Sequence, residues 1–286
     1  MVEDKRVLKQ FHELLGQRKD IWSSWQTPQL ISSELGSAQS VVDKVADLIG
    51  EGTHGPYFEV SRNRYAHYLA AAIATLPTKA SVLDVGNAPG HVAIGFSLLG
   101  HDVRGLNLNA DWRSTYPSEE WYEKFNVIEH DIEKAALPFA ESSFDAVLFT
   151  EVLEHVGITH PSKIVAEICR VLKPGGVLIF STPNVCNISN LYALLTGANI
   201  FWGPSIFYGS LDRHNREYTP REVDELMFGA GLKQVISWGL NDYSNWRADG
   251  AAFANEFIAE FGDNHPLCRN TIAGVYAKPM GDNRRT

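Results

Sequence analysis

The sequence predicts an α/β protein with a doubly wound, mostly parallel sheet. Between residues 79 and 185, short apolar runs of strand type alternate with helix-like segments. This alternation is typical of a parallel sheet with helices on both faces. A glycine-rich turn at 86–90 joins the first such strand to a helix, and Lys173-Pro174-Gly175-Gly176 precedes another apolar strand. Turns of this kind separate successive elements of a wound sheet.

The first 78 residues are expected to be helical. Apolar residues recur at helical spacing in three stretches, at 7–15, 41–49 and 65–76. Such a repeat places the apolar side chains on one face of each helix. We therefore expect an N-terminal helical extension or cap over 1–78 and a main domain over 79–286.

The main domain divides into short strands and helices. Strands are expected at 81–85, 102–108, 126–129, 144–149 and 176–181, and helices at about 90–99, 118–124 and 161–172. After residue 218 the order is a helix at 219–230, a strand at 232–238, a helix near 248–261 and a strand at 270–277. Residues 186–218 are rich in aromatics, glycine and asparagine and show little periodicity. A long irregular insertion is usually functional, so we expect a substrate-side lid there.

The bulk composition fits a globular enzyme. The chain has 286 residues, 44% of them hydrophobic, and a net charge of −9. An acidic chain disfavours nucleic acid or an anionic membrane surface as the main partner. The three cysteines are widely spaced, which indicates neither a zinc site nor a disulfide framework. With no long apolar run or signal segment, a cytoplasmic protein is expected.

The turn after the first strand is the strongest functional signal. Asp84 lies near the end of that strand, and Gly86 and Gly90 follow in the turn. Glycine lets the backbone approach a ligand closely, and the N-terminus of the next helix offers N–H groups. Asn107 ends the second strand, where nucleotide-binding folds face the ribose hydroxyls. These features suit an adenosine-containing ligand with a charged tail.

Several further segments follow in a fixed order: His130–Ile132, Leu137–Phe139, Ser143–Phe149, Glu151–Val156 and Arg170–Gly176. Over about residues 79–240, this series resembles the class I S-adenosylmethionine-dependent methyltransferases, particularly those that methylate small molecules, quinones and sugars. The resemblance implies a Rossmann-like methyltransferase fold with a seven-stranded sheet whose last strand is antiparallel. It also implies S-adenosyl-L-methionine as the cofactor.

The resemblance assigns roles to particular residues. Those implied to contact the methionine part of the cofactor are Asp84, Gly86, Ala88 and Gly90, with Ala88 where a glycine is usual. Asn107 stands where an acidic residue normally binds the ribose, so it lacks the charge that strengthens such bonds. Asp131 and Ile132 match the adenine site. Thr150 lies at the end of the fourth strand, beside the expected position of the transferred methyl group.

The chemistry of methyl transfer to a hydroxyl points to catalytic candidates. A hydroxyl acceptor benefits from a base that takes its proton. His155, just after the fourth strand, and His214, in the insertion, are candidates for that base, and Glu151 is a third catalytic candidate. The alternative makes His155 a structural residue at a helix start and His214 a loop residue that bonds the helix start at Thr219.

Aromatic and cationic residues complete the expected pocket. The rings of the insertion region either line an acceptor pocket or pack as a lid on the core: Phe201, Trp202, Phe207, Tyr208 and Tyr218. N-terminal Tyr57, Arg62 and Tyr65 are expected to close over the cofactor. The alternative makes Arg62 and Arg64 solvated surface residues.

A metal site is a second interpretation of the same histidines. Glu151, Glu154, His155 and His214 offer oxygen and nitrogen ligands suited to Mg²⁺, Mn²⁺ or Fe²⁺. The set is similar to that of the small-RNA 3′-end 2′-O-methyltransferases, which grip a vicinal diol. The main expectation is nevertheless no metal, because the Glu-x-x-Glu-His pattern is common in methyltransferases that bind none. The acidic chain disfavours an RNA end as acceptor.

We therefore expect a methyltransferase that modifies oxygen on a small molecule or sugar, in small-molecule or glycan biosynthesis. A nucleotide-dependent oxidoreductase would need a tighter glycine turn and an acid at position 107, and it leaves Leu172–Gly176 unexplained. A non-catalytic cofactor-binding relative is the other alternative, and Ala88 and Asn107 favour it. The sequence leaves the acceptor, the oligomeric state and O- versus N- or C-methylation open.

Overall fold

The computed structural model describes residues 5–16, 28–49, 55–209, 213–241, 248–262 and 268–281. Its centre is a seven-stranded sheet with the strand order β3-β2-β1-β4-β5-β7-β6. The strands are β1 (Ser81–Val85), β2 (Asp102–Asn107), β3 (Ile128–Glu129), β4 (Phe144–Thr150), β5 (Leu172–Pro183), β6 (Lys233–Leu240) and β7 (Thr271–Ala277). The antiparallel strand is β7, which pairs with β5 and β6. This confirms the expected doubly wound, mostly parallel sheet.

Strand β5 begins earlier than expected, at Leu172 rather than at 176. The Lys-Pro-Gly-Gly segment stays in the sheet because the register against β4 shifts between Phe144 and Ala146. Gly175 has a φ of +80°, a conformation that glycine adopts without steric cost. The segment that the sequence marks as a turn is therefore an irregular first part of strand β5.

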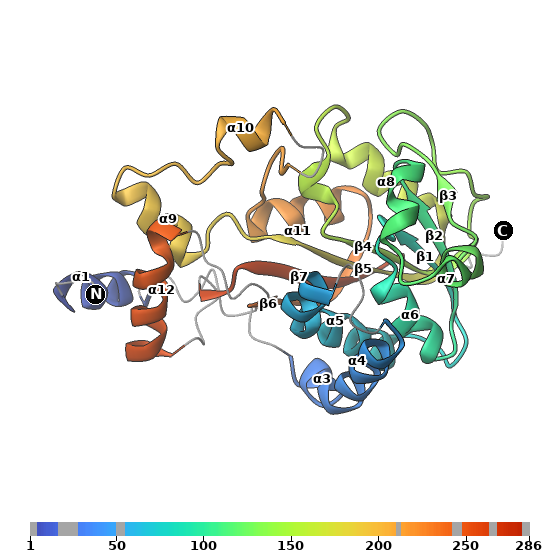
Figure 1. The fold of residues 1–286 in the computed structure, drawn as a ribbon, viewed down its shortest axis with the longest axis horizontal. Coiled ribbons are helices and arrows are strands. Elements are labelled where there is room, and N and C mark those ends of the chain that lie inside the picture. The colour runs from blue at the N-terminus through green and yellow to red at the C-terminus, as the bar shows by residue number, and fades with distance from the viewer. Residues whose placement is uncertain are drawn as a thin grey trace.

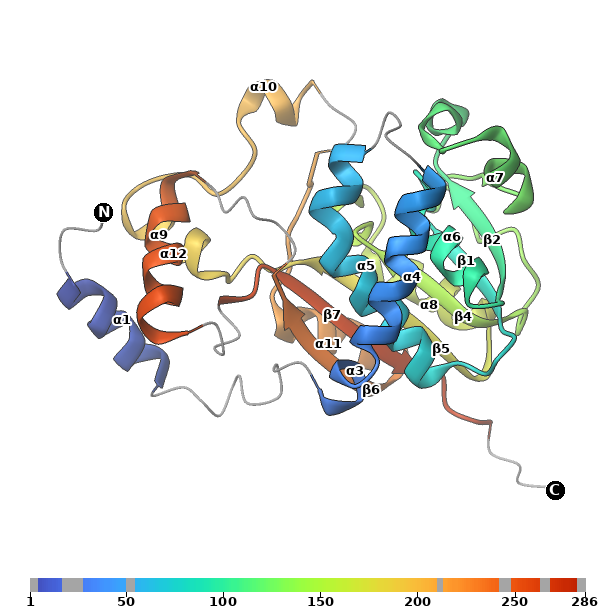
Figure 2. The same ribbon diagram turned by 60° about the horizontal axis from the view of Figure 1, so that its bottom comes forward.

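Helices cover both faces of the sheet (Figures 1 and 2). One face carries α4 (Leu35–Ile49), α5 (Gly55–Thr75) and α6 (His91–Leu98), and the opposite face carries α8 (Pro161–Val171) and α11 (Pro220–Gly229). Short helices connect them: α3 (Gln29–Ser32), η1 (Ala110–Thr115), α7 (Glu119–Lys124) and η2 (Leu153–His155). Among the described helices, none combines the length and apolar character needed to cross a bilayer.

The N-terminal helices α4 and α5 share one hydrophobic core with the sheet. Tyr68, Leu69 and Ala72 of α5 belong to the same buried cluster as Val82 of β1 and Ile179 of β5. Burial of such apolar area is the main driving force for packing. Helix α5 is therefore one of the layers on the sheet, and its inner face lies beside the carboxyl ends of the strands.

A second, smaller cluster forms a peripheral lobe (Figure 2). It joins α1 (Lys5–Gly16), α9 (Ile188–Leu195) and α12 (Ala248–Phe261), which pack around Phe253 and Phe257. The insertion at 186–218 thus contains α9 and the short helix α10 (Pro204–Phe207). The lobe holds one end of the insertion while the other end returns to the sheet.

Candidate functional site

One cavity of about 910 Å³ opens at the carboxyl ends of the parallel strands. Its walls include the last residues of β1, β2 and β5, which is where wound sheets bind ligands. We call one side the turn end, formed by Gly86, Ala88, Asn107, Asp131 and Ile132. We call the other side the histidine end, formed by Glu151, Glu154, His155 and His214. Five of the eight predicted cofactor residues and all three predicted catalytic residues therefore line one space.

Three of the predicted cofactor residues are not among the residues that line this cavity: Asp84, Gly90 and Thr150. Gly90 instead lies below the turn, with a φ of +86°. A Cβ added at this position would lie 2.7 Å from Cδ1 of Tyr116. Gly86 has a φ of +78°, and a Cβ there would lie 2.4 Å from Cγ2 of Val152. Both positions exclude larger residues, because their positive φ favours glycine and because a side chain would collide with its neighbours.

A chain of hydrogen bonds runs beneath the turn end. Nδ2 of Asn87 donates to Asp84 at 2.7 Å, and the hydroxyl of Tyr116 donates to Oδ1 of Asn87. Nδ2 of Asn107 donates to the Tyr116 hydroxyl at 2.9 Å, and the Ala88 N–H donates to Oδ1 of Asn107 at 3.0 Å. Burial raises the pKa of Asp84 to about 7. The turn is thus fixed by the side chains below it.

Asn107 lines the cavity, although part of its amide is used internally. A primary amide has two N–H donors and two acceptor lone pairs. Asn107 uses one N–H donor in its bond to Tyr116 and one acceptor lone pair in its bond from Ala88. The residue can therefore contact a ligand while it holds the turn, a double role that the sequence does not reveal.

A carboxylate beside Asp131 links the turn end to the histidine end. Oε2 of Glu133 accepts the backbone N–H groups of Gly157 at 3.1 Å and of Thr159 at 2.7 Å. The Ile158 N–H donates to the same oxygen at 2.5 Å. This oxygen fixes the loop that directly follows His155. Sequence reasoning missed Glu133, because nothing local marks its bond to a loop 24 residues away.

Glu151 lies at the histidine end in a strained backbone conformation, with a φ of +55°. Its side chain is held by Ser181 Oγ, which donates to Oε1 at 2.6 Å, and by Arg64 Nη1, which lies 3.0 Å from Oε2. Non-glycine residues with positive φ persist where surrounding contacts hold them, often at functional sites.

Arg64 corrects the sequence-based alternative of a solvated surface residue. Its side chain is 1% exposed and reaches Glu151 from α5. Arg62 does lie at the surface, where it pairs with Glu59 at 2.7 Å and with Asp43 at 3.2 Å. The signal that could have found Arg64 is its helical register with polar Tyr57, Ser61 and Tyr68, since the hydroxyls of Tyr57 and Ser61 accept bonds from it.

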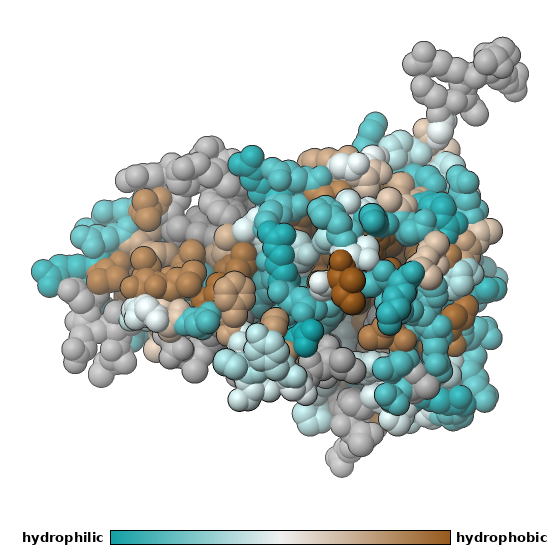
Figure 3. All heavy atoms as spheres, turned by 90° about the horizontal axis from the view of Figure 1, so that it is seen from above, coloured by the Kyte–Doolittle hydropathy of each residue, from teal (hydrophilic) through white to brown (hydrophobic). Residues whose placement is uncertain are grey.

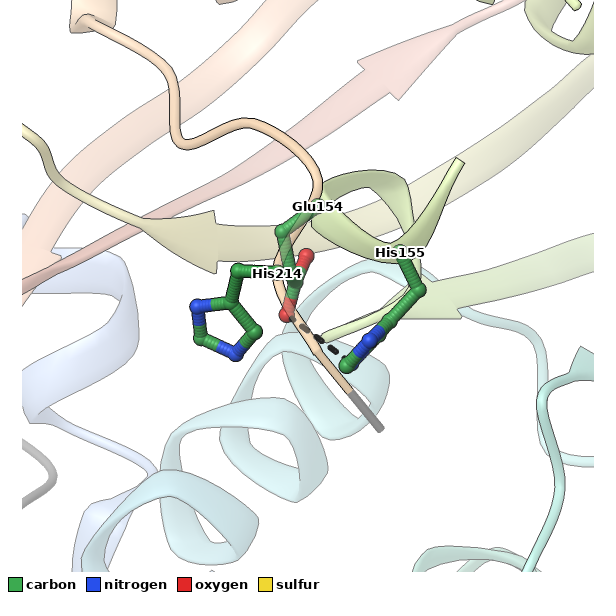
Figure 4. A group of neighbouring side chains, drawn as sticks. All are labelled: Glu154, His155 and His214. Carbon is green, nitrogen blue, oxygen red and sulfur yellow. Dashed lines mark ion pairs between the residues drawn. The ribbon is translucent and has the colours of Figure 1, made fainter. Parts of the chain in front are cut away.

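Glu154 is the most buried acid of the histidine end, with 1% exposure. Thr182 Oγ1 donates to its Oε2 at 2.9 Å. Burial raises the pKa of Glu154 well above its usual value, and the nearby Glu151 raises it further. Figure 4 shows the rings of His155 and His214 directed toward this carboxylate.

The two predicted histidines lie together, with ring centroids 5.1 Å apart. Nδ1 of His155 lies 3.0 Å from the carbonyl oxygen of Arg213, and Nδ1 of His214 lies 3.0 Å from Oε1 of Glu217. His214 thus bonds Glu217, whereas the structural alternative had it bond the helix start at Thr219. The N–H of Asn215 donates to the Glu154 carbonyl at 2.7 Å, which ties the insertion to η2.

The predicted aromatic residues divide into two groups. Phe201 and Trp202 line the cavity, and the Trp202 ring lies 5.4 Å from the ring of His214. Tyr218 instead packs in the core with 4% exposure, and Tyr208 is 81% exposed. Figure 3 shows hydrophobic surface gathered at the end of the molecule that carries α9.

Comparisons with known proteins show the family of this chain. The family described as "Methyltransferase domain" matches residues 83–180. An uncharacterized methyltransferase of Mycobacterium sp. (strain JLS) is 32% identical over 201 residues, which cover 68% of this chain and 70% of the relative.

A "Ubiquinone biosynthesis O-methyltransferase" of Psychrobacter arcticus is 30% identical over 56% of this chain, and the match spans 62% of that enzyme's length. The solved structure of a SAM-dependent methyltransferase from Archaeoglobus fulgidus has a TM-score of 0.54 and 16% identity, over 79% of this chain and 100% of that one. This likeness supports the fold.

Proposed function

Because this chain belongs to the class I S-adenosylmethionine-dependent methyltransferases, we propose that it methylates a hydroxyl oxygen of a small molecule, with carbohydrates among the candidates. The observation that carries the proposal is the single cavity that joins the turn end to the histidine end. The bound cofactor supplies a methyl group on a sulfonium centre, and transfer to oxygen leaves a thioether and releases the hydroxyl proton. The protein must therefore align the acceptor, exclude water and help that proton to leave.

The turn end fits the cofactor. A cavity of about 910 Å³ accommodates a nucleoside with its tail. Gly86 keeps the wall open, because any Cβ there would collide with Val152. Asp131 and Ile132 would hold the adenine, Asn107 the ribose, and Gly86 and Ala88 the methionine part. Glu151, which directly follows β4 and lines the cavity, would lie beside the reactive part of the ligand, whereas Thr150, the last residue of β4, would act from behind the cavity wall.

The histidine end fits the acceptor. His155 and His214 line the same cavity and are held by hydrogen bonds through Nδ1. We assign these two residues to the binding and activation of the acceptor hydroxyl, and we assign Glu151 to the boundary between acceptor and cofactor. Arg64 is a positioning residue, because it acts through its ion pair with Glu151.

The mouth of the cavity favours an acceptor with an apolar portion. Phe201 and Ile206 both line the cavity and are 61% and 47% exposed. Aromatic and aliphatic walls with a few polar groups are typical of small-molecule sites. The net charge of −9 makes a nucleic-acid acceptor a poor electrostatic match.

Calorimetry with S-adenosylhomocysteine tests the cofactor assignment. The wild type should bind it, and Asp131→Ala should bind about 10- to 150-fold more weakly, since a hydrogen bond to a charged group contributes about 1.5–3 kcal/mol. Glu225→Ala, an exposed carboxylate on α11, is the matched control and should bind normally. Equal affinity in all three proteins would remove Asp131 from the site.

The acceptor class is tested by methyl transfer to phenols, catechols and sugars, with the product position read by NMR. An O-methyl product supports the proposal. Methylation of nitrogen or carbon only would overturn the choice of oxygen. Binding of S-adenosylhomocysteine without turnover on any acceptor would favour the non-catalytic alternative.

A further inference from the structure

Three potential metal ligands meet at the histidine end. Glu154, His155 and His214 each place one ligand atom within 4.8 Å of the others (Figure 4). Two of them come from η2 and the third from the insertion, 59 residues later along the chain. In the part of the chain that the structure describes, this is the group that brings three such side chains together.

The hydrogen bonds of the two histidines fix their protonation pattern. The carbonyl oxygen of Arg213 can only accept, so Nδ1 of His155 carries the proton in their 3.0 Å bond. The Glu217 carboxylate oxygen likewise accepts from Nδ1 of His214 at 3.0 Å. In the neutral rings the lone pair therefore resides on Nε2. Metal-binding histidines use this arrangement, because the outer acceptor orients the ring and raises its basicity.

The spacing of the ligand atoms is close to that of a bound cation. First-row divalent cations bind nitrogen and oxygen at about 2.0–2.2 Å, so neighbouring ligand atoms lie about 3.0–3.5 Å apart. Nε2 of His155 lies 3.9 Å from Oε1 of Glu154, and the three ligand atoms all lie within 4.8 Å of one another. The three side chains would therefore move slightly closer together on binding.

The surroundings keep the three ligands in place. Asn215 donates from its N–H to the Glu154 carbonyl at 2.7 Å and from Nδ2 to the His155 carbonyl at 2.6 Å. Thr182 holds the second oxygen of Glu154 at 2.9 Å. A carboxylate with 1% exposure is costly to bury unless a cation or donors compensate it. Arg64 compensates Glu151, the other acid at this end.

We propose that Glu154, His155 and His214 bind one divalent first-row cation of the Mn²⁺ or Fe²⁺ type, with its remaining positions open to the cavity. A set of two histidines and one carboxylate is the typical ligand set of such ions. Glu151, which belonged to the four-residue alternative, stays outside because it is bound to Arg64 and Ser181. The proposal deepens the proposed function: the acceptor hydroxyl would coordinate the cation, which lowers the pKa of a bound hydroxyl and orients its oxygen.

Titration of untagged protein with Mn²⁺ alone, followed by the EPR signal of the unbound ion, tests the site without any methyl transfer. We expect one tight site in the wild type and at least ~10-fold weaker binding in His214→Ala. His160→Ala is the matched control, since this exposed histidine on the N-terminal side of α8 should leave binding unchanged. Binding that is absent in the wild type, or equal in His214→Ala, overturns the proposal.

A second variant guards against misfolding of the first. Glu217→Gln keeps a hydrogen-bond acceptor for His214 but removes the charge, and we expect Mn²⁺ binding to weaken by roughly 10-fold with an unchanged melting temperature. Unchanged Mn²⁺ affinity in this variant would show that Glu217 does not support His214 as a metal ligand, and it would count against the site. Calorimetry with S-adenosylhomocysteine on the same samples separates the two proposals, because loss of cofactor binding would contradict the proposed function and leave the metal site standing.

Discussion

The two ends of the cavity are built in different ways. At the turn end, the supporting side chains lie within one stretch of about 30 residues, from Asp84 to Tyr116, and they bond to one another beneath the turn. At the histidine end, most contacts join distant parts of the chain, as in Arg64 to Glu151, His155 to Arg213 and Asn215 to Glu154, and only the bond of His214 to Glu217 is local among those described above. The turn end is thus a local structure, whereas the histidine end depends on α5 and the insertion together. Changes at the two ends should therefore separate cofactor binding from turnover.

The largest expected effect is loss of turnover at the histidine end. His155→Ala should lower kcat by ~10²–10⁴-fold, because it removes a group that activates the acceptor hydroxyl. Affinity for S-adenosylhomocysteine, measured by calorimetry, should stay nearly unchanged. His160→Ala should keep full turnover. A His155→Ala enzyme with normal turnover would reduce this residue to a structural role and erase the contrast between the two ends.

The ion pair of Arg64 on α5 with Glu151, which directly follows β4, should dominate the stability of the histidine end. Arg64→Met leaves Glu151 without its buried cation, and breaking a buried pair from one side costs about 3–5 kcal/mol. The free energy of unfolding in urea measures this loss. Arg62→Met breaks an exposed pair of the same helix and should cost less than about 1 kcal/mol. Equal losses in the two variants would contradict the structural role of Arg64.

The turn end should show its own pH dependence. Burial raises the pKa of Asp84 from an ordinary value of 3.8 to about 7. The contribution of this group to the free energy of unfolding is therefore fully present below pH ~4 and is lost as the pH rises through 7. At 1.36 kcal/mol per pKa unit, the total loss is about 4 kcal/mol. Asp84→Asn should remove this slope, as measured by urea unfolding at pH 4 to 8.

Asp145 provides the control of opposite sign for that measurement. Burial raises its pKa, but hydrogen bonds from the Ser81 N–H and from Lys173 outweigh burial, so the net pKa is lowered. Its contribution is present above the unfolded pKa and is lost as the pH falls. Asp145→Asn should therefore lose stability mainly at neutral pH. Parallel curves for wild type and Asp84→Asn would mean that Asp84 is not held protonated.

The smallest expected effect tests how closely the turn approaches the ligand. Gly86→Ala adds a methyl group 2.4 Å from Val152 in the cavity wall, and we expect cofactor affinity to fall by about 1–3 kcal/mol. Gly100→Ala is matched in backbone strain, since its φ is +93°, but its Cβ would lie 3.7 Å from Thr78. Gly100→Ala should lose stability without losing affinity. Equal affinity in both variants would place the ligand away from the turn.

The difference between the ends also explains what the sequence could predict. The alternation of strands and helices and the glycine turn are local patterns, and they predicted the mostly parallel sheet and a ligand site at the turn, where Gly86, Ala88 and Asn107 line the cavity. Arg64 was open to interpretation as a surface residue because its partner lies 87 positions later. The bond of Asn107 to Tyr116 was equally hidden, since a loop brings the tyrosine back. Side-chain pairs between distant elements follow from packing, which leaves little local signal.

The lobe of α1, α9 and α12 has a consequence for biosynthesis. Helix α1 is made well before helix α12, which begins 232 residues after α1 ends (248 − 16), yet Leu8 of α1 packs against Phe253 and Phe257 of α12. Domains fold as their parts emerge, and contacts between distant segments form late. The apolar face of α1 therefore stays uncovered until α12 has been made. Because α9, at one end of the insertion, belongs to the same lobe, we expect that end of the insertion to become ordered only when α12 is present.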